Sequence, residues 1–364
     1  METKPLVPPA SVFAWLGVIG IPTTLALAFV WTAGGLTPQR LTQNTLLSAL
    51  SKVDGVHPGF RRNHAKGICV TGWFESNGNA AKFSSSAMLE KNKSKVIGRL
   101  ALAGGMPFQA DAPGKVRSMA LRMISSDGEE WRMGMNDIPV FPVRTPQEFQ
   151  DLQLASAPNP ATGRPDPLRV IGFRANHPWL QAAAERISHR SISSGFSDDT
   201  YRSLNSFLLV SKDGSKTAVR WTMVPTRVVT SAAPNADAHN SLFERLITEI
   251  HASPLQWHMI VTIAGKQDVI NDPTQGWSDH DEKVDAGTLT LENVESEEHG
   301  PCTGITFDPT ILPGGVNVSD DPILAARSAS YMRSFYLRSR EKRPLPAITD
   351  VMTDSQVSGK GKKS

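Results

Sequence analysis

An imidazole and a guanidinium lie three residues apart, just before a segment with the alternating pattern of a β-strand. His64 precedes this segment, residues 66–76, and Arg61 lies upstream of it. A histidine at a strand end can reach over an enclosed cavity and exchange a proton with a substrate, while an arginine can bind an anion nearby. The alternative is a structural histidine that only satisfies hydrogen bonds at the strand end.

A second pair of chemically capable residues occurs near the C-terminus. Arg327 and Tyr331 are four residues apart in a predicted helix over residues 322–340, which begins after Ser319-Asp320-Asp321 with a proline in its first turn. Residues four apart share one helix face, and a guanidinium one turn from a phenol favours the phenolate form. The alternative is an exposed arginine beside an ordinary tyrosine.

The elements that must position these residues are mostly strands. Two sets of strand patterns, each with an Asp-Gly hairpin turn, predict an α+β protein built on an eight-stranded antiparallel β-barrel with surrounding helices. The strands are expected at residues 66–76, 95–102, 116–124, 129–135, 139–143, 206–210, 217–224, 255–264 and 288–291. Helices are expected from Thr37 to Lys52, from Thr145, from His177 and over residues 240–251.

The N-terminal segment has a different composition. Residues 6–38 carry no charged side chain, and residues 12–31 are dense in apolar residues with Trp15 and Trp31 near the ends. About 20 apolar residues can cross a bilayer, so we expect an N-terminal transmembrane helix, with residues 1–36 as a membrane anchor. A cleaved signal sequence is the alternative. Lys4 favours export of the domain that follows, which predicts a periplasmic location.

Composition limits the remaining possibilities. The net charge of +3 over 364 residues gives no reason to expect a nucleic-acid partner. The basic segment 346–364 is predicted to be a disordered tail, which leaves residues 37–345 for the barrel domain. The two cysteines, Cys69 and Cys302, have no CxxC spacing, so a zinc or redox dithiol site is not supported. A disulfide between them is left open.

Several segments, in order, resemble haem catalases. Arg61-x-x-His64-Ala-Lys-Gly looks like the distal-histidine segment of that family, and the strand from Arg99 to Gly105 resembles one carrying an arginine for a haem propionate. Residues 135–144 resemble the distal-asparagine segment, with Asn136 and the aromatic Phe141. Arg327-x-x-x-Tyr331, followed by Arg338, is similar to the proximal-ligand helix. The likeness covers residues 53–340 and is greatest to the short catalase-related peroxidases.

This resemblance implies haem b as the cofactor, with Tyr331 as the axial ligand of its iron. His64 and Asn136 would act on the bound peroxide. The other implied cofactor-binding residues are Arg61, Arg99 and Arg338 for the propionates, Phe141 near the ring, and Arg327 beside the phenolate. One departure is Ala101, which stands where catalases commonly carry a serine bonded to the distal histidine.

The expected function is a haem peroxidase that reduces hydrogen peroxide or organic hydroperoxides with a small-molecule electron donor, with modest catalase activity. One alternative is a fatty-acid hydroperoxide isomerase like allene oxide synthase, against which Asn63 argues because those enzymes usually have threonine there. Another is a membrane-tethered barrel that binds haem or an apolar ligand without turnover. The arms that join full-length catalases into tetramers are absent, so a monomer or homodimer is expected.

Overall fold

The structure is a computed structural model that describes residues 16–32, 41–112, 114–227, 239–342 and 345–348. The chain divides into two compact units, residues 1–42 and 43–364. In the first unit, a π-helical turn, Leu16–Gly20, is followed by helix α2, Ile21–Thr32.

The transmembrane helix predicted over residues 12–31 is not found. None of the described helices is long and apolar enough to cross a membrane. Helix α2 has 12 residues, a length of about 18 Å against the roughly 30 Å of a bilayer's hydrocarbon core. Residues 12–15 lie outside the described part of the chain.

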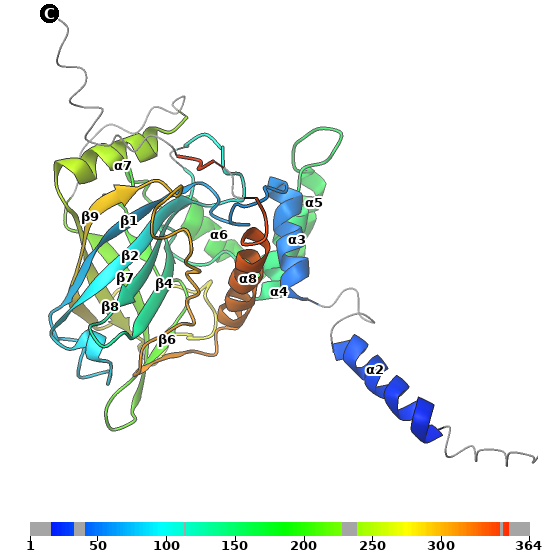
Figure 1. Cartoon of the computed structure of the whole chain (residues 1–364), viewed down its shortest axis with the longest axis horizontal. Helices are drawn as coiled ribbons and strands as arrows, with labels where there is room; N and C mark the ends of the chain where they lie inside the picture. Colours follow the sequence, from blue (N-terminus) through cyan, green and yellow to red (C-terminus); the bar gives the residue numbers. More distant parts are fainter. Residues whose placement is uncertain (1–15, 33–40, 113, 228–238, 343–344, 349–364) are drawn as a thin grey trace, which may run out of the picture. The chain divides into compact units, whose positions relative to one another are not determined.

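Within the described part of the second unit, eight antiparallel strands close into the predicted barrel (Figure 1). Their order around the barrel is β7-β5-β4-β3-β2-β1-β9-β8, and pairing of β7 with β8 completes the ring. The ring is built from β1 (Gly67–Ser76), β2 (Asn92–Leu102), β3 (Arg117–Ile124), β4 (Glu130–Asn136), β5 (Tyr201–Arg202), β7 (Lys216–Pro225), β8 (Leu255–Ile263) and β9 (Lys283–Glu295). Two further strands, β6 (Phe207–Val210) and β10 (Val316–Val318), extend the sheet from β7.

The barrel interior is filled with side chains. Successive residues in a strand point to opposite faces, and along β3 and β4 the buried set includes Met119, Met133 and Met135. Trp221 packs edge-on against Trp131, with ring centroids 5.2 Å apart, in the same cluster. Because side chains fill the interior, a functional site on these strands is expected on their outer face.

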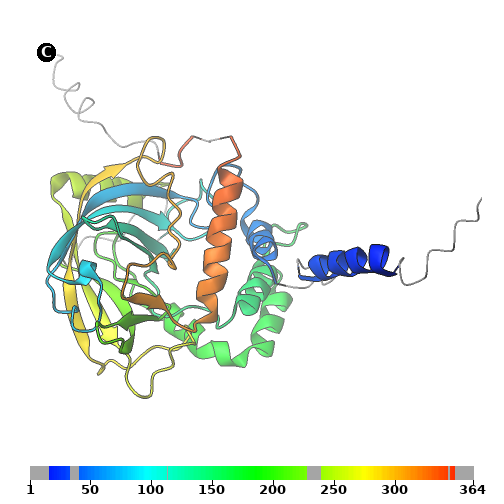
Figure 2. The ribbon, with the colours of Figure 1, turned by 60° about the horizontal axis from the view of Figure 1, so that its bottom comes forward.

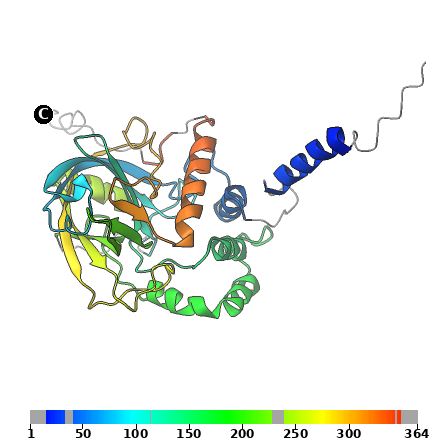
Figure 3. The same ribbon diagram turned by 90° about the horizontal axis from the view of Figure 1, so that it is seen from below.

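Helices cover the outside of the barrel. Helix α8 runs beside the barrel wall with α3 next to it, and α3 in turn packs on α4 (Figures 2 and 3). A capping box between Thr145 and Glu148 starts α4, as the Thr-Pro-Gln-Glu sequence predicts. The helices are α3 (Gln43–Asp54), α4 (Pro146–Ser156), α5 (Pro167–Asn176), α6 (Gln181–Ser188), α7 (Ser241–Ala252) and α8 (Pro322–Arg338).

Three features of the structure differ from what the sequence predicted. Residues 139–143 do not form a strand, because Pro139 and Pro142 cannot donate to a ladder. Helix α5 was not predicted, since its N-terminal proline falls at the end of a stretch rich in proline and glycine. Ile348 was assigned to the disordered tail, but it is buried in the main core cluster. The rest of that tail, residues 349–364, lies outside the described residues.

Cys69 and Cys302 form a disulfide, which the sequence left open. Cys69 lies in β1, where it pairs across the ladder with Arg99 of β2. Cys302 lies in the connection between β9 and α8, and both cysteines are fully buried. The disulfide therefore ties this connection to the first strand of the barrel.

Candidate active site

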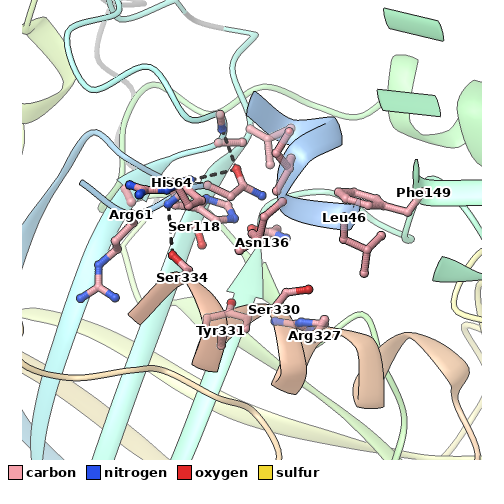
Figure 4. Close-up of a pocket in the computed structure, with 18 of the residues that line it drawn as sticks. Leu46, Arg61, His64, Ser118, Asn136, Phe149, Arg327, Ser330, Tyr331 and Ser334 are labelled. Carbon is pink, nitrogen blue, oxygen red and sulfur yellow. Dashed lines mark hydrogen bonds between the residues drawn. The ribbon is translucent and has the colours of Figure 1, made fainter. Parts of the chain in front are cut away.

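A cavity of about 560 Å³ lies between the outer face of the barrel and helix α8 (Figure 4). A volume of this size falls within the range of sites for small molecules and cofactors. Strands β2, β3 and β4 form one wall and α8 the other, while α3 and α4 contribute apolar side chains such as Leu46 and Phe149. All of the predicted site residues line it: Arg61, His64, Arg99, Asn136, Phe141, Arg327, Tyr331 and Arg338.

His64 is held in an unusual backbone conformation. Its φ is 54°, in the left-handed region that residues other than glycine rarely adopt. The Asn63 side chain accepts hydrogen bonds from the backbone N–H groups of His64, at 2.8 Å, and Gly104, at 3.0 Å. The His64 carbonyl accepts a hydrogen bond of 2.7 Å from Arg99 Nη1. These bonds hold a conformation that costs about 1–3 kcal/mol, as is found at functional sites.

The environment of His64 keeps its ring neutral. Burial, together with the positive charges of Arg99, Arg327 and Arg61, lowers the His64 pKa to about 3. Within the described residues, His64 Nδ1 and Asn136 Oδ1 are buried without a hydrogen-bond partner. A neutral imidazole with a free ring nitrogen can accept a proton from a bound molecule.

Tyr331 lies on the opposite side of the cavity (Figure 4). The Arg327 guanidinium carbon lies 5.9 Å from the centroid of the Tyr331 ring, and Arg327 Nη2 donates a hydrogen bond of 2.9 Å to the Gly134 carbonyl. Gly134 permits this packing, because a Cβ atom there would lie 2.6 Å from Arg327 Nη2 and 3.1 Å from the Tyr331 hydroxyl oxygen. The predicted pair on α8 is therefore seated against strand β4.

Two residues that the sequence did not reveal complete this side of the site. Arg327 Nη1 donates to the Asn205 side chain, and Asn205 Nδ2 donates to Asp321 Oδ2 at 2.7 Å. Asp321 also caps α8, since its Oδ1 accepts a hydrogen bond from the backbone N–H of Ile323. The series of side-chain contacts from Tyr331 through Arg327 and Asn205 thus ends at Asp321, at the N-terminus of the same helix, α8.

The cavity has the features of a slot for a flat, acidic group. Small residues at four-residue intervals, Ala326, Ser330 and Ser334, line it along α8. Phe141, in the segment that follows β4, also lines the cavity and stacks on Phe149, with ring centroids 6.2 Å apart. Small side chains on one helix face leave room for a planar ring to lie across it.

A cluster of guanidinium groups stands at one end of the slot. Burial and the nearby charges of Arg99 and Arg338 together lower the pKa of Arg61 to about 9, and burial lowers that of Arg338 to about 10. Their partner is the half-buried Glu297, which the sequence did not reveal. Burial raises the pKa of Glu297, but Arg99, Arg61 and Arg338 together outweigh this and the net shift is downward. Three guanidinium groups, those of Arg61, Arg99 and Arg338, interact here with the single carboxylate of Glu297, so positive charge exceeds negative charge and favours an anion.

These observations fit a haem group. A phenol oxygen stands on one side of the slot, an imidazole with a free ring nitrogen stands on the other, and excess positive charge at the end suits the two carboxylates of a porphyrin. Ala101 also lines the cavity, so no hydroxyl is present at that position. The nearby Ser118 directs its hydroxyl to the Met135 carbonyl, at 2.9 Å.

Known proteins resemble this chain over most of its length. A family model described as catalase matches residues 28–342. A catalase-related peroxidase of Synechococcus elongatus is 31% identical over 334 residues, covering 90% of this chain and 97% of the relative. One of Mycolicibacterium paratuberculosis is 29% identical, covering 84% and 96%.

Solved structures show the same fold. A fungal catalase matches with a TM-score of 0.68 at 19% identity, covering 78% of this chain and 60% of its own. Catalase A from Saccharomyces cerevisiae matches with a TM-score of 0.67 at 19% identity, covering 77% and 61%. The chain therefore spans about three fifths of the length of these catalases.

Proposed function

The chain belongs to the catalase family, and on that premise we propose that it is a haem-dependent peroxidase reducing hydrogen peroxide or organic hydroperoxides. The observation that carries the proposal is the placement of His64 and Tyr331 on opposite sides of one cavity beside an arginine cluster. We propose haem b as the form of the cofactor, and its two propionates suit this cluster.

The residues that would hold the haem are those already described. Tyr331 would supply the axial oxygen ligand, with the positive charge of Arg327 beside it. Arg61, Arg99 and Arg338 would face the propionates, because a guanidinium matches a carboxylate in shape and charge. When bound, the haem iron supplies the electrons and the Lewis acidity that cleavage of a peroxide O–O bond requires.

The chain's own contribution to the reaction is proton transfer and positioning. His64 is neutral at physiological pH, so a ring nitrogen can accept the proton of a peroxide hydroxyl. It then returns this proton to the departing oxygen, which leaves as water or as an alcohol. Asn136 donates a hydrogen bond from its amide to the peroxide and orients it. The full reaction consumes one peroxide, two electrons and two protons. It yields one alcohol and one water from an organic hydroperoxide, and two waters from hydrogen peroxide.

The electrons come from a small reductant rather than from a second peroxide. This part of the proposal rests on the two catalase-related peroxidases that resemble the chain over nearly their whole length. Catalase activity is accordingly modest, and the protein works as a monomer or homodimer.

The enzyme works outside the cytoplasm, in an oxidising compartment such as the periplasm. The support for this location is the buried Cys69–Cys302 disulfide, because such bonds persist mainly in exported proteins. Alkylation of free thiols in freshly lysed cells tests it. Both cysteines should resist labelling until a reductant and a denaturant are added together.

The central experiment adds peroxide to the purified, haem-loaded protein and follows the haem absorbance. The expected result is a rapid spectral change that an aromatic donor reverses, with little oxygen evolved. A lipid hydroperoxide converted to product at the same rate without any donor would instead indicate an isomerase. A protein that stays colourless despite ample haem supply would overturn the proposal.

A further inference from the structure

The connection at residues 296–306, called here the clamped loop, is fixed to the barrel by its disulfide. Cys302 is bonded to Cys69 of β1, and its backbone N–H also donates to Cys69 Sγ at 3.3 Å. Gly300 packs so closely against this bond that a Cβ atom there would lie 2.7 Å from Cys69 Sγ. The middle of the loop is thus held at the ladder position where Cys69 faces Arg99.

Backbone carbonyls of the clamped loop accept hydrogen bonds from two arginines of the cavity. Arg61 Nη2 donates to the carbonyls of Cys302, at 3.0 Å, and Ile305, at 3.1 Å. Arg338 donates from Nη1 to the Thr303 carbonyl, at 2.7 Å, and from Nη2 to that of Ile305, at 3.1 Å. The directions of both guanidiniums therefore depend on the path of the loop.

A carboxylate of the same loop holds the third arginine. Glu297 accepts two hydrogen bonds of 2.8 Å from Arg99, one from Nε and one from Nη2. Arg99 then donates to the carbonyls of His64, at 2.7 Å, and Ala65, at 3.1 Å. Its guanidinium lies directly on Gly67, where a Cβ atom would lie 2.4 Å from Arg99 Cζ. One continuous set of contacts joins the loop to the left-handed backbone of His64.

We infer that the disulfide-clamped loop is a positioning element for the active site, an inference that rests on the proposed function. It sets the guanidiniums of Arg61 and Arg338 toward the carboxylates of the cofactor. Through Glu297 and Arg99 it also holds His64 in place. The loop residues that make these contacts, Glu297, Cys302, Thr303 and Ile305, do not line the cavity. They act through the three arginines and His64, which do.

The test compares two ligands that differ only in their carboxylates. The apo forms of the wild type and of the double variant Cys69→Ala/Cys302→Ala are titrated with haem and with haem dimethyl ester. The wild type should prefer haem strongly, since each charge-assisted hydrogen bond contributes about tenfold in affinity. In the variant, haem affinity should fall about tenfold or more while ester affinity stays within about twofold.

A disulfide also stabilises the folded state, because it restricts the unfolded chain. Titrations are therefore run where circular dichroism shows both proteins fully folded. Equal weakening of haem and ester, or no change in either, would overturn the inference, because both results leave the carboxylate preference intact.

A second variant leaves the disulfide in place. Glu297→Gln removes the charged partner of Arg99, and its matched control is Glu282→Gln, whose carboxylate pairs with Lys82 at the exposed surface at 3.4 Å. The haem-loaded Glu297→Gln protein should react with peroxide about tenfold more slowly, whereas the control should match the wild type. An unchanged rate would contradict the link to His64.

The outcomes also separate this inference from the proposed function. A wild-type protein that strongly prefers haem to its dimethyl ester but does not react with peroxide would refute the peroxidase proposal. That result would still support the positioning of the arginines. Failure of the wild type to prefer haem over its ester would refute the positioning of the arginines directly.

Discussion

Replacing Gly134 by alanine should weaken cofactor binding without harming the fold. A Cβ atom at this position in β4 would lie 2.6 Å from Arg327 Nη2 and 3.1 Å from the Tyr331 hydroxyl oxygen. The end of an arginine side chain is flexible, so Arg327 can swing away at little cost. It then loses its hydrogen bond to the Gly134 carbonyl and its place beside Tyr331.

The size of the effect follows from the lost contact. With Arg327 displaced, the Tyr331 oxygen would lose the charge-assisted contact that favours it as a ligand. A contact of this kind contributes about 1.5–3 kcal/mol, which corresponds to a loss of about 10- to 150-fold in haem affinity. Stability should change little, because alanine restricts the unfolded chain by about 0.4–1 kcal/mol relative to glycine and offsets part of the strain. Haem affinity is thus expected to fall while the stability of the fold changes little.

The assay is a haem titration of the apo protein, followed by absorbance, with thermal unfolding measured in parallel. The matched control is Gly172→Ala in α5, where an added Cβ atom meets nothing within 4 Å. The control should bind haem like the wild type. Wild-type affinity in Gly134→Ala would refute the packing of Arg327 and Tyr331 against β4, and equal loss in both variants would point to a general effect of alanine.

Three further predictions concern the two sides of the cavity. His64→Ala should slow the reaction with peroxide by about 10²–10⁴-fold, the usual contribution of a general acid–base group, while haem binding persists. Stopped-flow absorbance measures the reaction rate, and titration measures haem binding. Tyr331→Phe should release haem to an excess of a competing apo-globin much faster than the wild type, and equal release rates would exclude Tyr331 as the ligand. In the apo protein, the His64 pKa of about 3 lies below the unfolded value of 6.5. Between pH 3 and 6.5 the unfolded state therefore binds more protons at His64 than the folded state does. The contribution of His64 to the free energy of unfolding should consequently decline as the pH falls from 6.5 toward 3. Urea unfolding across this pH range should show a shallower slope in His64→Ala.

Local patterns in the sequence identified the parts of the site that lie on one element. Arg327 and Tyr331 could be paired because helix spacing places residues four apart on one face. His64 and Asn136 were found through the order of family-like segments, and the structure lines one cavity with both. The alternation along the chain likewise predicted the barrel, which the structure confirms.

Contacts between distant segments could not be predicted in this way. Asn205 meets Arg327 across 122 residues, and Glu297 meets Arg99 across 198. Neither residue has a local pattern that sets it apart from other polar residues of a loop. The role of Gly134 depends on side chains from another element, so it too became visible only in the folded chain. For the apolar N-terminus, the described residues form the 12-residue helix α2, and none of the described helices is long and apolar enough to cross a membrane.

The alternation of β3 and β4 has a chemical consequence for a protein that handles peroxides. Sulfur atoms of methionine are readily converted to sulfoxide, which disrupts the packing around them. Met119, Met133 and Met135 point into the barrel, whereas their neighbours Ser118, Gly134 and Asn136 lie on the reactive side. The thickness of one sheet therefore separates the peroxide site from the methionine sulfur atoms inside the barrel. A shift of one residue in strand register would exchange the inward and outward residues.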